Sequence, residues 1–408
     1  MIVVQKFGGS SVADVEKIKN VAKIVKHQRD NGDKVVVVVS AMLGKTDELL
    51  SLCSGIRQNI DNDAMAEYDA VVASGEQVTA GLLALALQEI GVKAKSMCGW
   101  QIGLHTDSSY TKARITSIEN VHILQQYLDS ENVVVVAGFQ GISDDGRIST
   151  LGRGGSDTSA IALGISLKAD RCDIYKDVDG VYTSDPRICN RAQKIDTMSL
   201  EEMLEMSSTG SKVLQVRAVE MAMRYGMPIY VRSTFNLAMA GTMITKDGGS
   251  EGENLAGISH TVNESMITVS GIGDISKFYV EILGKFLQNN IGIDMLIQNE
   301  YLQDEASFSD ITFVINKSEV ERMRLTLEDF SGKNVFANFT MQHDIAKISV
   351  VGASMRNISG VAAKIFTSLK SESIDILCVS TSDIKVSAVV KVKYIELALR
   401  TLHEVFFE

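Results

Sequence analysis

Cysteine and histidine are too few and too scattered in this sequence to suggest a metal centre or a disulfide framework. The chain has five cysteines and six histidines. The cysteines are an odd number with no C-x-x-C pair, which argues against both disulfides and thiolate metal sites. The histidines show no ligand spacing such as H-x-x-x-H, and no Ser/His/Asp order stands out. We therefore expect inert thiols and assign no metal ligand.

The sequence also lacks an excess of positive charge and a long uncharged apolar run. It has 51 acidic and 40 basic residues, which gives a net charge of −11. Such an acidic surface repels phosphate backbones and anionic membranes. No run approaches the roughly 18 uncharged apolar residues of a membrane span, and the first residues do not resemble a signal peptide. We expect a cytoplasmic protein without nucleic-acid or membrane partners.

The first half of the chain alternates short β-branched runs with helical stretches. The length of 408 residues is enough for about two or three domains. The alternation predicts an α/β fold with a mostly parallel sheet and helices on both faces. Five consecutive valines, Val35–Val39, fit an interior strand. The expected strands are 2–4, 34–40, 132–137, 173–176 and 229–232, and the expected helices are 12–28, 76–90 and 156–167.

The second half contains a repeat. A polar, glycine-rich stretch, 246–256, is the expected linker. Beyond it the order strand, helix, strand, strand, helix occurs twice, which predicts two ferredoxin-like βαββαβ units. A pair of small repeats after a large α/β domain indicates regulation. The expected domains are a catalytic domain over 1–245 and two small domains over 257–338 and 339–408.

A glycine-rich turn near the N-terminus has the composition of a phosphate site. The segment Lys6–Ser11 reads Lys-Phe-Gly-Gly-Ser-Ser, so that two glycines and two hydroxyl residues follow a lysine. Glycines let the backbone approach a phosphate, and a lysine ammonium can neutralise a phosphoryl group in transfer. The order differs from a Walker loop, where the lysine follows the glycines. Taken alone, the segment also fits a plain tight turn.

A second glycine-rich turn, Gly152–Asp157, carries a guanidinium at Arg153 and a carboxylate at Asp157. Arg153 can hold a carboxylate through two parallel hydrogen bonds. The plainer interpretation is a turn with a solvated salt bridge. Two such turns in one sheet would place two anions at the same carboxyl edge, where open α/β sheets bind ligands. Together the turns favour a binding function.

Six motifs in order give the chain a resemblance to the aspartate kinases of the amino acid kinase family. The motifs are Lys6–Ser11, Val38–Ala41, Ser74–Glu76, Gly152–Asp157, Asp177–Tyr182 with Asp185–Arg187, and Gly210–Leu214. The repeat resembles paired ACT domains through Val351–Met355 and Val379–Ser382. The resemblance covers nearly the whole chain and implies an amino acid kinase fold followed by two ACT domains.

In that family the γ-phosphoryl group of ATP passes to the β-carboxylate of L-aspartate, with Mg²⁺ as a further cofactor. The carboxylate is already ionised near pH 7, so no general base is required. The site must bring two anions together and neutralise the phosphoryl group between them. The resemblance implies that Lys6 and Lys212 flank this group and that Asp157 positions both lysines.

For the substrate, the resemblance implies that Arg153 binds the α-carboxylate and Glu76 the α-ammonium, while Ser40, Thr46 and Gly154 line the pocket. Glu76 also has a plainer interpretation as an acid in the first turn of a helix, where the helix dipole favours it.

For the nucleotide, the resemblance points to the first glycine turn and to the segment from Lys176 to Arg187, with Tyr182 near the base or ribose and Arg187 on the phosphates. Many members have threonine where this chain has Lys176. A lysine there either adds a phosphate or ribose contact or points to solvent. The nucleotide candidates are Lys6, Gly8, Gly9, Ser10, Lys176, Asp177, Tyr182, Arg187 and Lys212.

In the family, the cleft between paired ACT domains binds lysine, threonine or both and inhibits the enzyme. Exposed sheet edges let such domains dock in pairs, so we expect a homo-oligomer, either a dimer or a tetramer. The effector candidates by resemblance are Asp274, Gln298, Asn299, Met355, Ser380 and Asp383. These residues can also be loop and strand-end groups that satisfy the backbone.

Two other functions stay open at this stage. One is another carboxylate kinase of the same fold, and the other is a non-catalytic amino acid sensor. The presence of Lys6, Arg153, Asp157 and Lys212 argues against the sensor.

Overall fold

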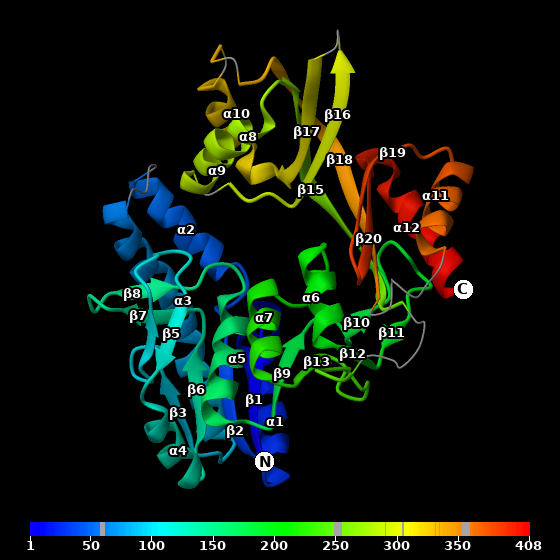
Figure 1. Cartoon of the computed structure of the whole chain (residues 1–408). Coiled ribbons are helices and arrows are strands. Elements are labelled where there is room, and N and C mark those ends of the chain that lie inside the picture. The colour runs from blue at the N-terminus through cyan, green and yellow to red at the C-terminus, as the bar shows by residue number, and fades with distance from the viewer. Residues whose placement is uncertain are drawn as a thin grey trace. The chain divides into compact units, whose positions relative to one another are not determined.

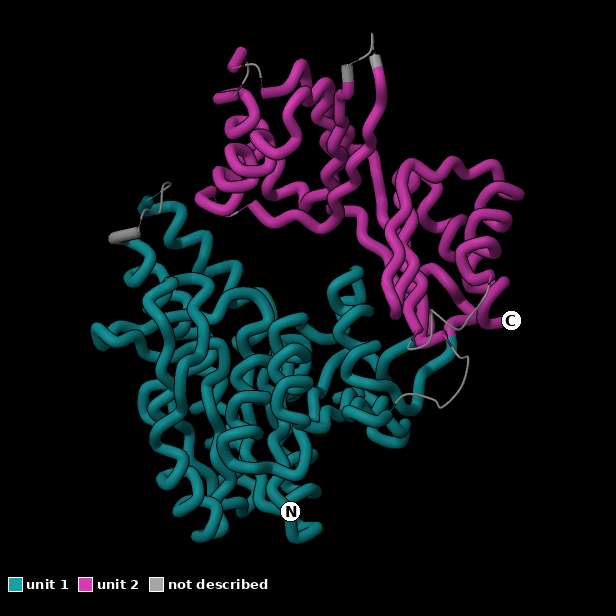
Figure 2. The backbone as a smooth tube through the Cα atoms, in the orientation of Figure 1, with its two compact units in different colours: residues 1–182, 193–252 teal, residues 183–192, 253–408 magenta. Residues whose placement is uncertain are grey.

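The structure, a computed structural model, describes residues 1–408 except 58–61, 249–254, 290, 304–305, 331, 334 and 353–359. It divides into two compact units (Figure 2). Unit 1 comprises Met1–Tyr182 and Gln193–Gly252, and unit 2 comprises Thr183–Ala192 and Glu253–Glu408. We call Thr183–Ala192 the inserted segment, because it belongs to unit 2 although both of its sequence neighbours belong to unit 1. Most of the expected linker lies outside the described residues.

Unit 1 contains a sheet with the strand order β12-β14-β13-β9-β1-β2-β6-β3 (Figure 1). β1, β2, β3, β6, β9 and β13 run parallel, and β14 runs antiparallel to β13. The valines of β2 are buried between two neighbouring strands, as the sequence predicts. The bounds are β1 (Ile2–Phe7), β2 (Lys34–Val39), β3 (Ala94–Met97), β6 (Val133–Ala137), β9 (Arg171–Lys176), β12 (Thr197–Ser199), β13 (Ile229–Ser233) and β14 (Thr242–Thr245).

Helices cover both faces of this sheet, which confirms the predicted α/β fold class. α1 and α3 share a core with Val35, Val37 and Val39 of β2. α5 packs against the opposite face, where Gly164 lies beside Val4 of β1. The helices described in unit 1 include α1 (Val15–Asp30), α2 (Lys45–Ile56), α3 (Asn62–Glu89), α4 (Val121–Asp129), α5 (Gly155–Leu167), α6 (Leu200–Ser208) and α7 (Val216–Tyr225).

Several elements of unit 1 differ from the sequence-based expectation. The sequence predicts the first helix from residue 12, but α1 begins at Val15 because the Asp14 side chain accepts a hydrogen bond from the Lys17 amide at 2.9 Å and caps it. Gly9–Val12 forms a 3₁₀ turn, η1. The smaller strands were not predicted. They are β3, β12 and β14 of the main sheet, then β4 (Leu104–Thr106), β5 (Ile115–Ile118), β7 (Gln140–Ser143) and β8 (Ile148–Thr150) in a second sheet, and the pair β10 (Val181–Tyr182) and β11 (Lys194–Ile195).

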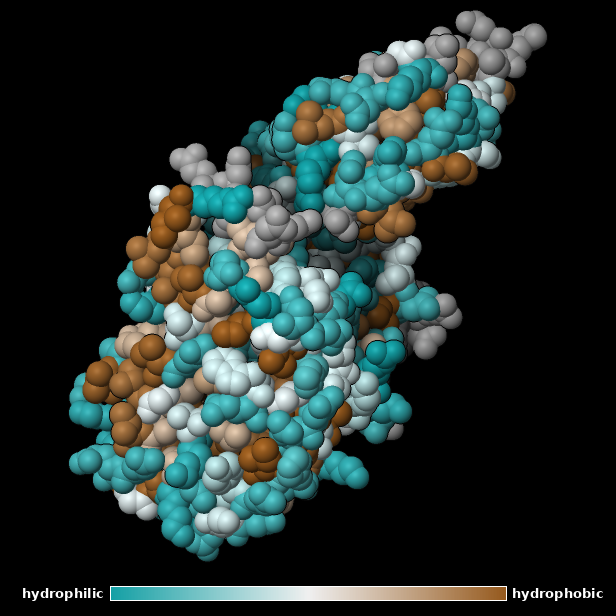
Figure 3. Space-filling view, turned by 90° about the vertical axis from the view of Figure 1, so that its left-hand side faces the viewer, coloured by the Kyte–Doolittle hydropathy of each residue, from teal (hydrophilic) through white to brown (hydrophobic). Residues whose placement is uncertain are grey.

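The predicted helix 76–90 is the second half of the much longer α3. Over Ala64–Glu89 this helix is long and apolar enough to cross a membrane, which the sequence analysis did not anticipate. Half of that window is buried within the structure, and core helices of globular proteins meet the same criteria. Its outer face keeps Val71, Val78 and Leu85 exposed. Figure 3 shows several patches of brown apolar side chains on the face of unit 1 that is turned toward the viewer.

Unit 2 contains a sheet with the strand order β16-β17-β15-β18-β20-β19. The strands are β15 (Gly257–Ile272), β16 (Met295–Gln303), β17 (Ala306–Asn316), β18 (Asn338–Val351), β19 (Ile376–Thr381) and β20 (Lys385–Lys391). The helices described are α8 (Ile275–Phe278), the π-helical turn η2 (Tyr279–Leu283), α9 (Gly284–Gln288), α10 (Val320–Glu328), α11 (Val361–Ser371) and α12 (Ile395–Phe407), with 3₁₀ turns η3 (Lys317–Glu319) and η4 (Val392–Tyr394). The predicted repeat of strand, helix, strand, strand, helix is therefore present twice.

The two repeats share their long strands. β15 and β18 pair antiparallel along their length, from Gly257 with Val351 to Ser270 with Asn338. The second half of β15 also pairs with β17, and the second half of β18 pairs with β20. Each repeat thus completes its sheet with a strand from the other, and each has its own buried core. We call them the first lobe and the second lobe.

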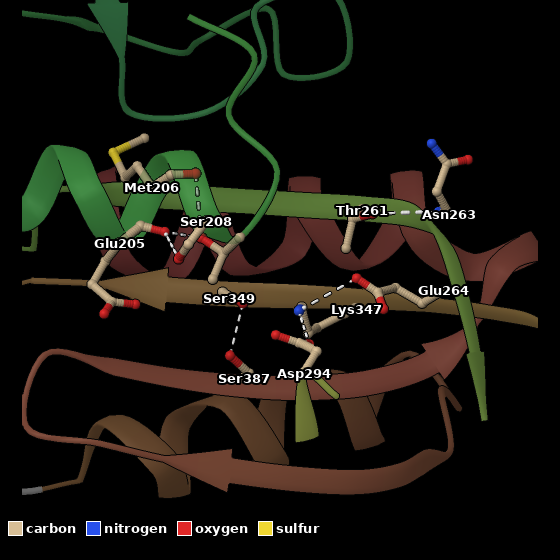
Figure 4. Close-up of polar contacts among 11 residues, drawn as sticks. Glu205, Met206, Ser208, Thr261, Asn263, Glu264, Asp294, Lys347, Ser349 and Ser387 are labelled. Atoms are coloured by element: carbon tan, nitrogen blue, oxygen red, sulfur yellow. Dashed lines mark hydrogen bonds and ion pairs between the residues drawn. The ribbon is translucent and has the colours of Figure 1, made fainter. Parts of the chain in front are cut away.

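An ion cluster around the buried Lys347 and Glu264 lies where β15 and β18 pass from one lobe to the other (Figure 4). The Lys347 ammonium lies 3.5 Å from Glu264 Oε1 and also pairs with Asp294. β15 changes register on either side of Glu264. Burial raises the pKa of Glu264, although Lys347 opposes this. The cluster ties both long strands to the residue just before β16.

The inserted segment is held by the second lobe. The Thr183 carbonyl accepts a hydrogen bond from the Ile258 amide at 2.7 Å, and its hydroxyl is 3.0 Å from Nε2 of the buried His403. Arg400 donates to the Ile188 carbonyl at 3.2 Å. Cys189 is buried in the core of the second lobe. The segment is therefore part of the packing of unit 2.

Candidate active site

The sequence motifs meet at the carboxyl edge of the unit 1 sheet. β1 lies between β2 and β9, and the three strands run parallel and in register. Their ends therefore bring Gly8, Ser40 and Lys176 to the same edge. The Ser40 amide donates to the Phe7 carbonyl at 3.1 Å, and the Gly8 amide donates to the Tyr175 carbonyl at 3.4 Å. This is where an open parallel sheet binds its ligands.

Two lysines flank one buried carboxylate at this edge. Lys6 Nζ lies 2.7 Å from Oδ1 of Asp157, and Lys176 Nζ lies 3.3 Å from Oδ2. Asp157 stands in the first turn of α5 and is 2% exposed. Burial raises the pKa of Asp157, but Lys6 and Lys176 outweigh burial and hold it below its ordinary value. Asp157 is therefore ionised at neutral pH and fixes both ammonium groups.

The partner of Asp157 differs in part from the expectation. The resemblance implies that Asp157 positions Lys6 and Lys212, whereas its ion pairs in the structure are with Lys6 and Lys176. Lys212 is exposed. The residue that follows its motif, Gln215, nevertheless packs against the second glycine turn, because a Cβ on Gly154 would lie 1.8 Å from the Gln215 side chain. Gly154 also has φ +73°, a left-handed backbone conformation that favours glycine. The lack of space for a Cβ and the backbone conformation therefore both require glycine there.

The first glycine turn packs closely against the residue that follows β2. A Cβ on Gly9 would lie 2.9 Å from the Ala41 carbonyl oxygen. A Cβ on Gly8 would lie 3.5 Å from the Lys6 ammonium. A larger side chain at residue 8 would therefore lie against this ammonium, and glycine keeps the space beside it free of side-chain atoms, which suits the approach of an anion. Ser10 is half-buried in η1.

Glu76 points one carboxylate oxygen at the backbone and leaves the other without a partner. Oε1 accepts a hydrogen bond from the Ala41 amide at 3.0 Å, and Oε2 is buried with no hydrogen-bond partner within the described structure. Burial raises the pKa of Glu76 to about 7. The interpretation of Glu76 as a first-turn acid is wrong, because α3 begins at Asn62. A buried, half-satisfied carboxylate is a natural site for a cation.

Two residues that the sequence analysis did not single out hold the second glycine turn. Arg217 of α7 donates to the carbonyls of Leu151 and Ala113, both at 2.8 Å. Asp69 of α3 accepts from the Thr150 amide and hydroxyl, both at 2.7 Å, and from the Thr111 amide at 2.8 Å. Asp69 carries no distinctive sequence signal, because Glu67 and Glu76 lie in the same helix.

The remaining substrate and nucleotide candidates are distributed as follows. Arg153 is exposed between Gly152 and Gly154, and Thr46 is half-buried in the first turn of α2. Tyr182 is half-buried in β10, and Asp177 is exposed. Arg187 lies in the inserted segment of unit 2, where it forms an ion pair with Asp185 at 2.7 Å. The nucleotide candidates are thus divided between the two units.

The effector candidates that the structure describes lie in loops and strands of unit 2, with Gln298 and Asn299 in the middle of β16. Asp274 caps α8 by accepting from the Lys277 amide at 3.0 Å, and Gln298 of β16 accepts from the Tyr279 hydroxyl at 2.7 Å. Ser380 lies in β19. Asn299 and Asp383 are exposed, and Met355 lies outside the described residues. Asp274 therefore has the backbone partner that the plainer interpretation expects, whereas the partner of Gln298 is a side chain.

Comparison with known proteins agrees with the two-part architecture. The model of the amino acid kinase family matches residues 1–233, and an ACT domain model matches residues 348–406. The chain is 45% identical to an aspartate kinase of Stutzerimonas stutzeri over 407 residues, which is 99% of this chain and 97% of that protein. The chain belongs to the aspartate kinase family. It is an enzyme of the class that phosphorylates carboxyl groups.

Other members of the aspartate kinase family extend this result. The chain is 41% identical to aspartokinase 2 of Bacillus subtilis, again over 99% of this chain and 97% of that protein. E. coli aspartokinase III in complex with lysine and aspartate (T-state) superposes with a TM-score of 0.76 at 25% identity and full coverage of both chains. The same enzyme with aspartate and ADP (R-state) gives 0.82 at 24% identity, also with full coverage, and shows the shared fold.

Proposed function

We propose that this chain transfers the γ-phosphoryl group of ATP to the β-carboxylate of L-aspartate and forms 4-phospho-L-aspartate, the first step toward lysine, threonine and methionine. The observation that carries the proposal is the pair of ammonium groups held by Asp157 next to the buried, half-satisfied Glu76. The two ammonium groups suit a phosphoryl anion, and the Glu76 carboxylate suits the ammonium group of an amino acid. The E. coli relative bound to aspartate and ADP supports both ligands.

Aspartate is recognised through charge pairing. The unpartnered oxygen of Glu76 accepts the α-ammonium, and the exposed guanidinium of Arg153 binds the α-carboxylate. Ser40, Thr46 and Gly154 line the pocket. A dicarboxylate without the ammonium would leave Glu76 buried without a partner, which favours an amino acid over a simple diacid.

Phosphoryl transfer requires positioning and neutralisation rather than proton transfer. The β-carboxylate of aspartate is ionised at neutral pH and acts as the nucleophile directly. Lys6 and Lys212 stabilise the charge that spreads over the transferring group, Gly8, Gly9 and Ser10 approach the phosphates, and Asp157 fixes the orientation of Lys6. The nucleotide is held further by Asp177, Tyr182 and Arg187.

Mg²⁺ is part of this proposal as a companion of the nucleotide. The described residues contain no group of three or more histidine, cysteine or acidic side chains that could hold a metal ion. Both oxygens of Asp157 already face lysines. This donor set fits a Mg²⁺ that is bound mainly by nucleotide phosphates and water, as is usual for this ion. When bound, it would neutralise phosphate charge.

Regulation is assigned to unit 2. We propose feedback inhibition by lysine, threonine or both, with Asp274, Gln298, Asn299, Met355, Ser380 and Asp383 as effector contacts. The paired repeats, and the relative that binds lysine, support this assignment. Assembly through unit 2 into a dimer or tetramer and a cytoplasmic location belong to the same proposal.

The test is aspartate-dependent release of ADP by the purified chain, with and without lysine and threonine, singly and together. Parallel reactions contain glutamate or acetylglutamate in place of aspartate. Turnover with aspartate alone supports the proposal. Turnover of glutamate but not aspartate indicates another carboxylate kinase, and effector binding without any turnover indicates a sensor.

A further inference from the structure

Lys176 occupies a place in the transfer site that sequence analysis left open. It is the last residue of β9, next to the strand that carries Lys6, and its ammonium donates to Asp157 Oδ2 at 3.3 Å. Its side chain is 18% exposed, so it points into the site rather than to solvent. Lys6 and Lys176 therefore bind opposite oxygens of one carboxylate.

The charges of this cluster do not balance. Two ammonium groups share the buried Asp157, and the nearby Asp177 is exposed to solvent. Burial and the neighbouring Lys6 lower the pKa of Lys176 in spite of Asp157. A buried excess of positive charge is unfavourable unless an anion compensates it. The two ammonium groups therefore share one fully ionised buried carboxylate, because Glu76, which also interacts with Lys6, has a pKa of about 7 and is only partly ionised at neutral pH.

The surroundings show where such an anion fits. Gly8 has no side chain to cover the Lys6 ammonium, since even a Cβ there would approach it to 3.5 Å. Lys176 reaches the same carboxylate from the neighbouring strand. A phosphate group carries several anionic oxygens, so that it can accept hydrogen bonds from both ammonium groups at once.

We propose that Lys176 is a second phosphate-binding lysine of the transfer site, which Asp157 holds beside Lys6 and which donates to phosphate oxygens of the bound nucleotide. This role rests on the proposed kinase function. It adds a cation at a position where many family members have threonine. It also gives Asp157 a definite task, which is to keep two like charges in place before the nucleotide arrives.

Calorimetric titration of the full-length chain with ADP, and separately with adenosine, tests the proposal. Lys176→Met should lower the affinity for ADP about ten- to a hundredfold, which is the range expected for the loss of one charge-assisted hydrogen bond. Adenosine, which has no phosphate, should bind as it does to the wild type. Lys176→Arg keeps the charge and should retain most of the ADP affinity. Lys95→Met removes an exposed lysine of β3 in the same sheet and should leave the affinities for ADP and adenosine unchanged.

A second comparison separates phosphate binding from simple neutralisation of Asp157. If Lys176 acted only as a counter-ion, its replacement would have no effect on ADP binding once Asp157→Asn had removed the charge. We expect Lys176→Met to weaken ADP in the Asp157→Asn background as well. An unchanged ADP affinity in either background overturns the proposal. A wild-type chain that binds neither ADP nor adenosine would contradict the proposed function itself, and this role with it.

Discussion

Glu76, in the middle of α3, is held by the backbone amide of Ala41, the second residue after β2, at 3.0 Å. The hydrogen bond uses one carboxylate oxygen and leaves the other buried and unpaired. A long helix and a central strand thus fix the carboxylate without satisfying it. The pH dependence of substrate binding follows from this arrangement.

Aspartate should bind more tightly as the pH rises through 7. The pKa of Glu76 is about 7 because of burial, and only the ionised carboxylate pairs with an ammonium group. Between about pH 6 and pH 8 the ionised fraction rises about tenfold, so KM for aspartate should fall about tenfold. Steady-state kinetics across this range measures it. Glu76→Gln should raise KM for aspartate and make it nearly independent of pH. A KM that still falls with pH in that variant would contradict the proposed role of Glu76.

The same group makes the substrate-free protein less stable as the pH rises. Its pKa in the fold lies above the ordinary value of 4.5, so the unfolded chain ionises first. The stability associated with Glu76 is therefore fully present below about pH 4.5 and is lost as the pH rises to about 7. Denaturant unfolding of wild type and Glu76→Gln at several pH values should show the two curves diverging over this window.

Lys6→Ala should lower kcat at least about a hundredfold while leaving the affinity for aspartate nearly intact, because the ammonium acts on the transferring group. The substitution also leaves Asp157 with Lys176 as its remaining ion-pair partner. Lys6→Arg keeps the charge and serves as the comparison. A normal kcat in the alanine variant would remove Lys6 from the mechanism.

Asp69→Asn should destabilise the fold by about 1–3 kcal/mol, since the amide cannot accept from all three donors without bringing its own NH₂ group against one of them. The donors belong to Thr111 and Thr150. Chemical denaturation gives the free energy of unfolding. Asp47→Asn, at an exposed position of α2, is the matched control and should change it by less than about 0.5 kcal/mol.

Lys347→Met should lower the free energy of unfolding, measured by chemical denaturation, by about 3–5 kcal/mol, because it leaves Glu264 buried without its cation. The loss should shrink at acidic pH, where Glu264 becomes protonated and no longer needs a partner. Adding Glu264→Gln to Lys347→Met should restore part of the stability. Lys317→Met, at an exposed position, is the control. Equal losses at neutral and acidic pH would show that the cluster is not held by charge.

The sequence predicted the sheet and the residues at its edge because local patterns encode them. Buried valine runs identify β2 and β6, and glycines with polar neighbours identify the turns that meet there. The charge partners of Asp157 were harder to predict. Lys6, Lys176 and Asp157 come together only through the pairing of β9 with β1 and the packing of α5, which involves residues far apart in the chain.

The plainer interpretation of Glu76 failed for a related reason. The apolar periodicity that places a helix over 76–90 does not show that the same helix begins at Asn62, because polar residues at its start resemble a loop. The repeat pattern also could not predict that the two lobes share β15 and β18. Each repeat reads as a complete unit in sequence, and only the pairing shows that neither closes its sheet alone.

The inserted segment means that no single cut through the polypeptide separates the two units. A chain that ended after Gly252 would keep Ile188 and Cys189 but lose the core that covers them. The complementary fragment would lack part of its own packing. Any attempt to study the catalytic half in isolation therefore has to replace residues 183–192 with a polar loop that joins β10 directly to β11.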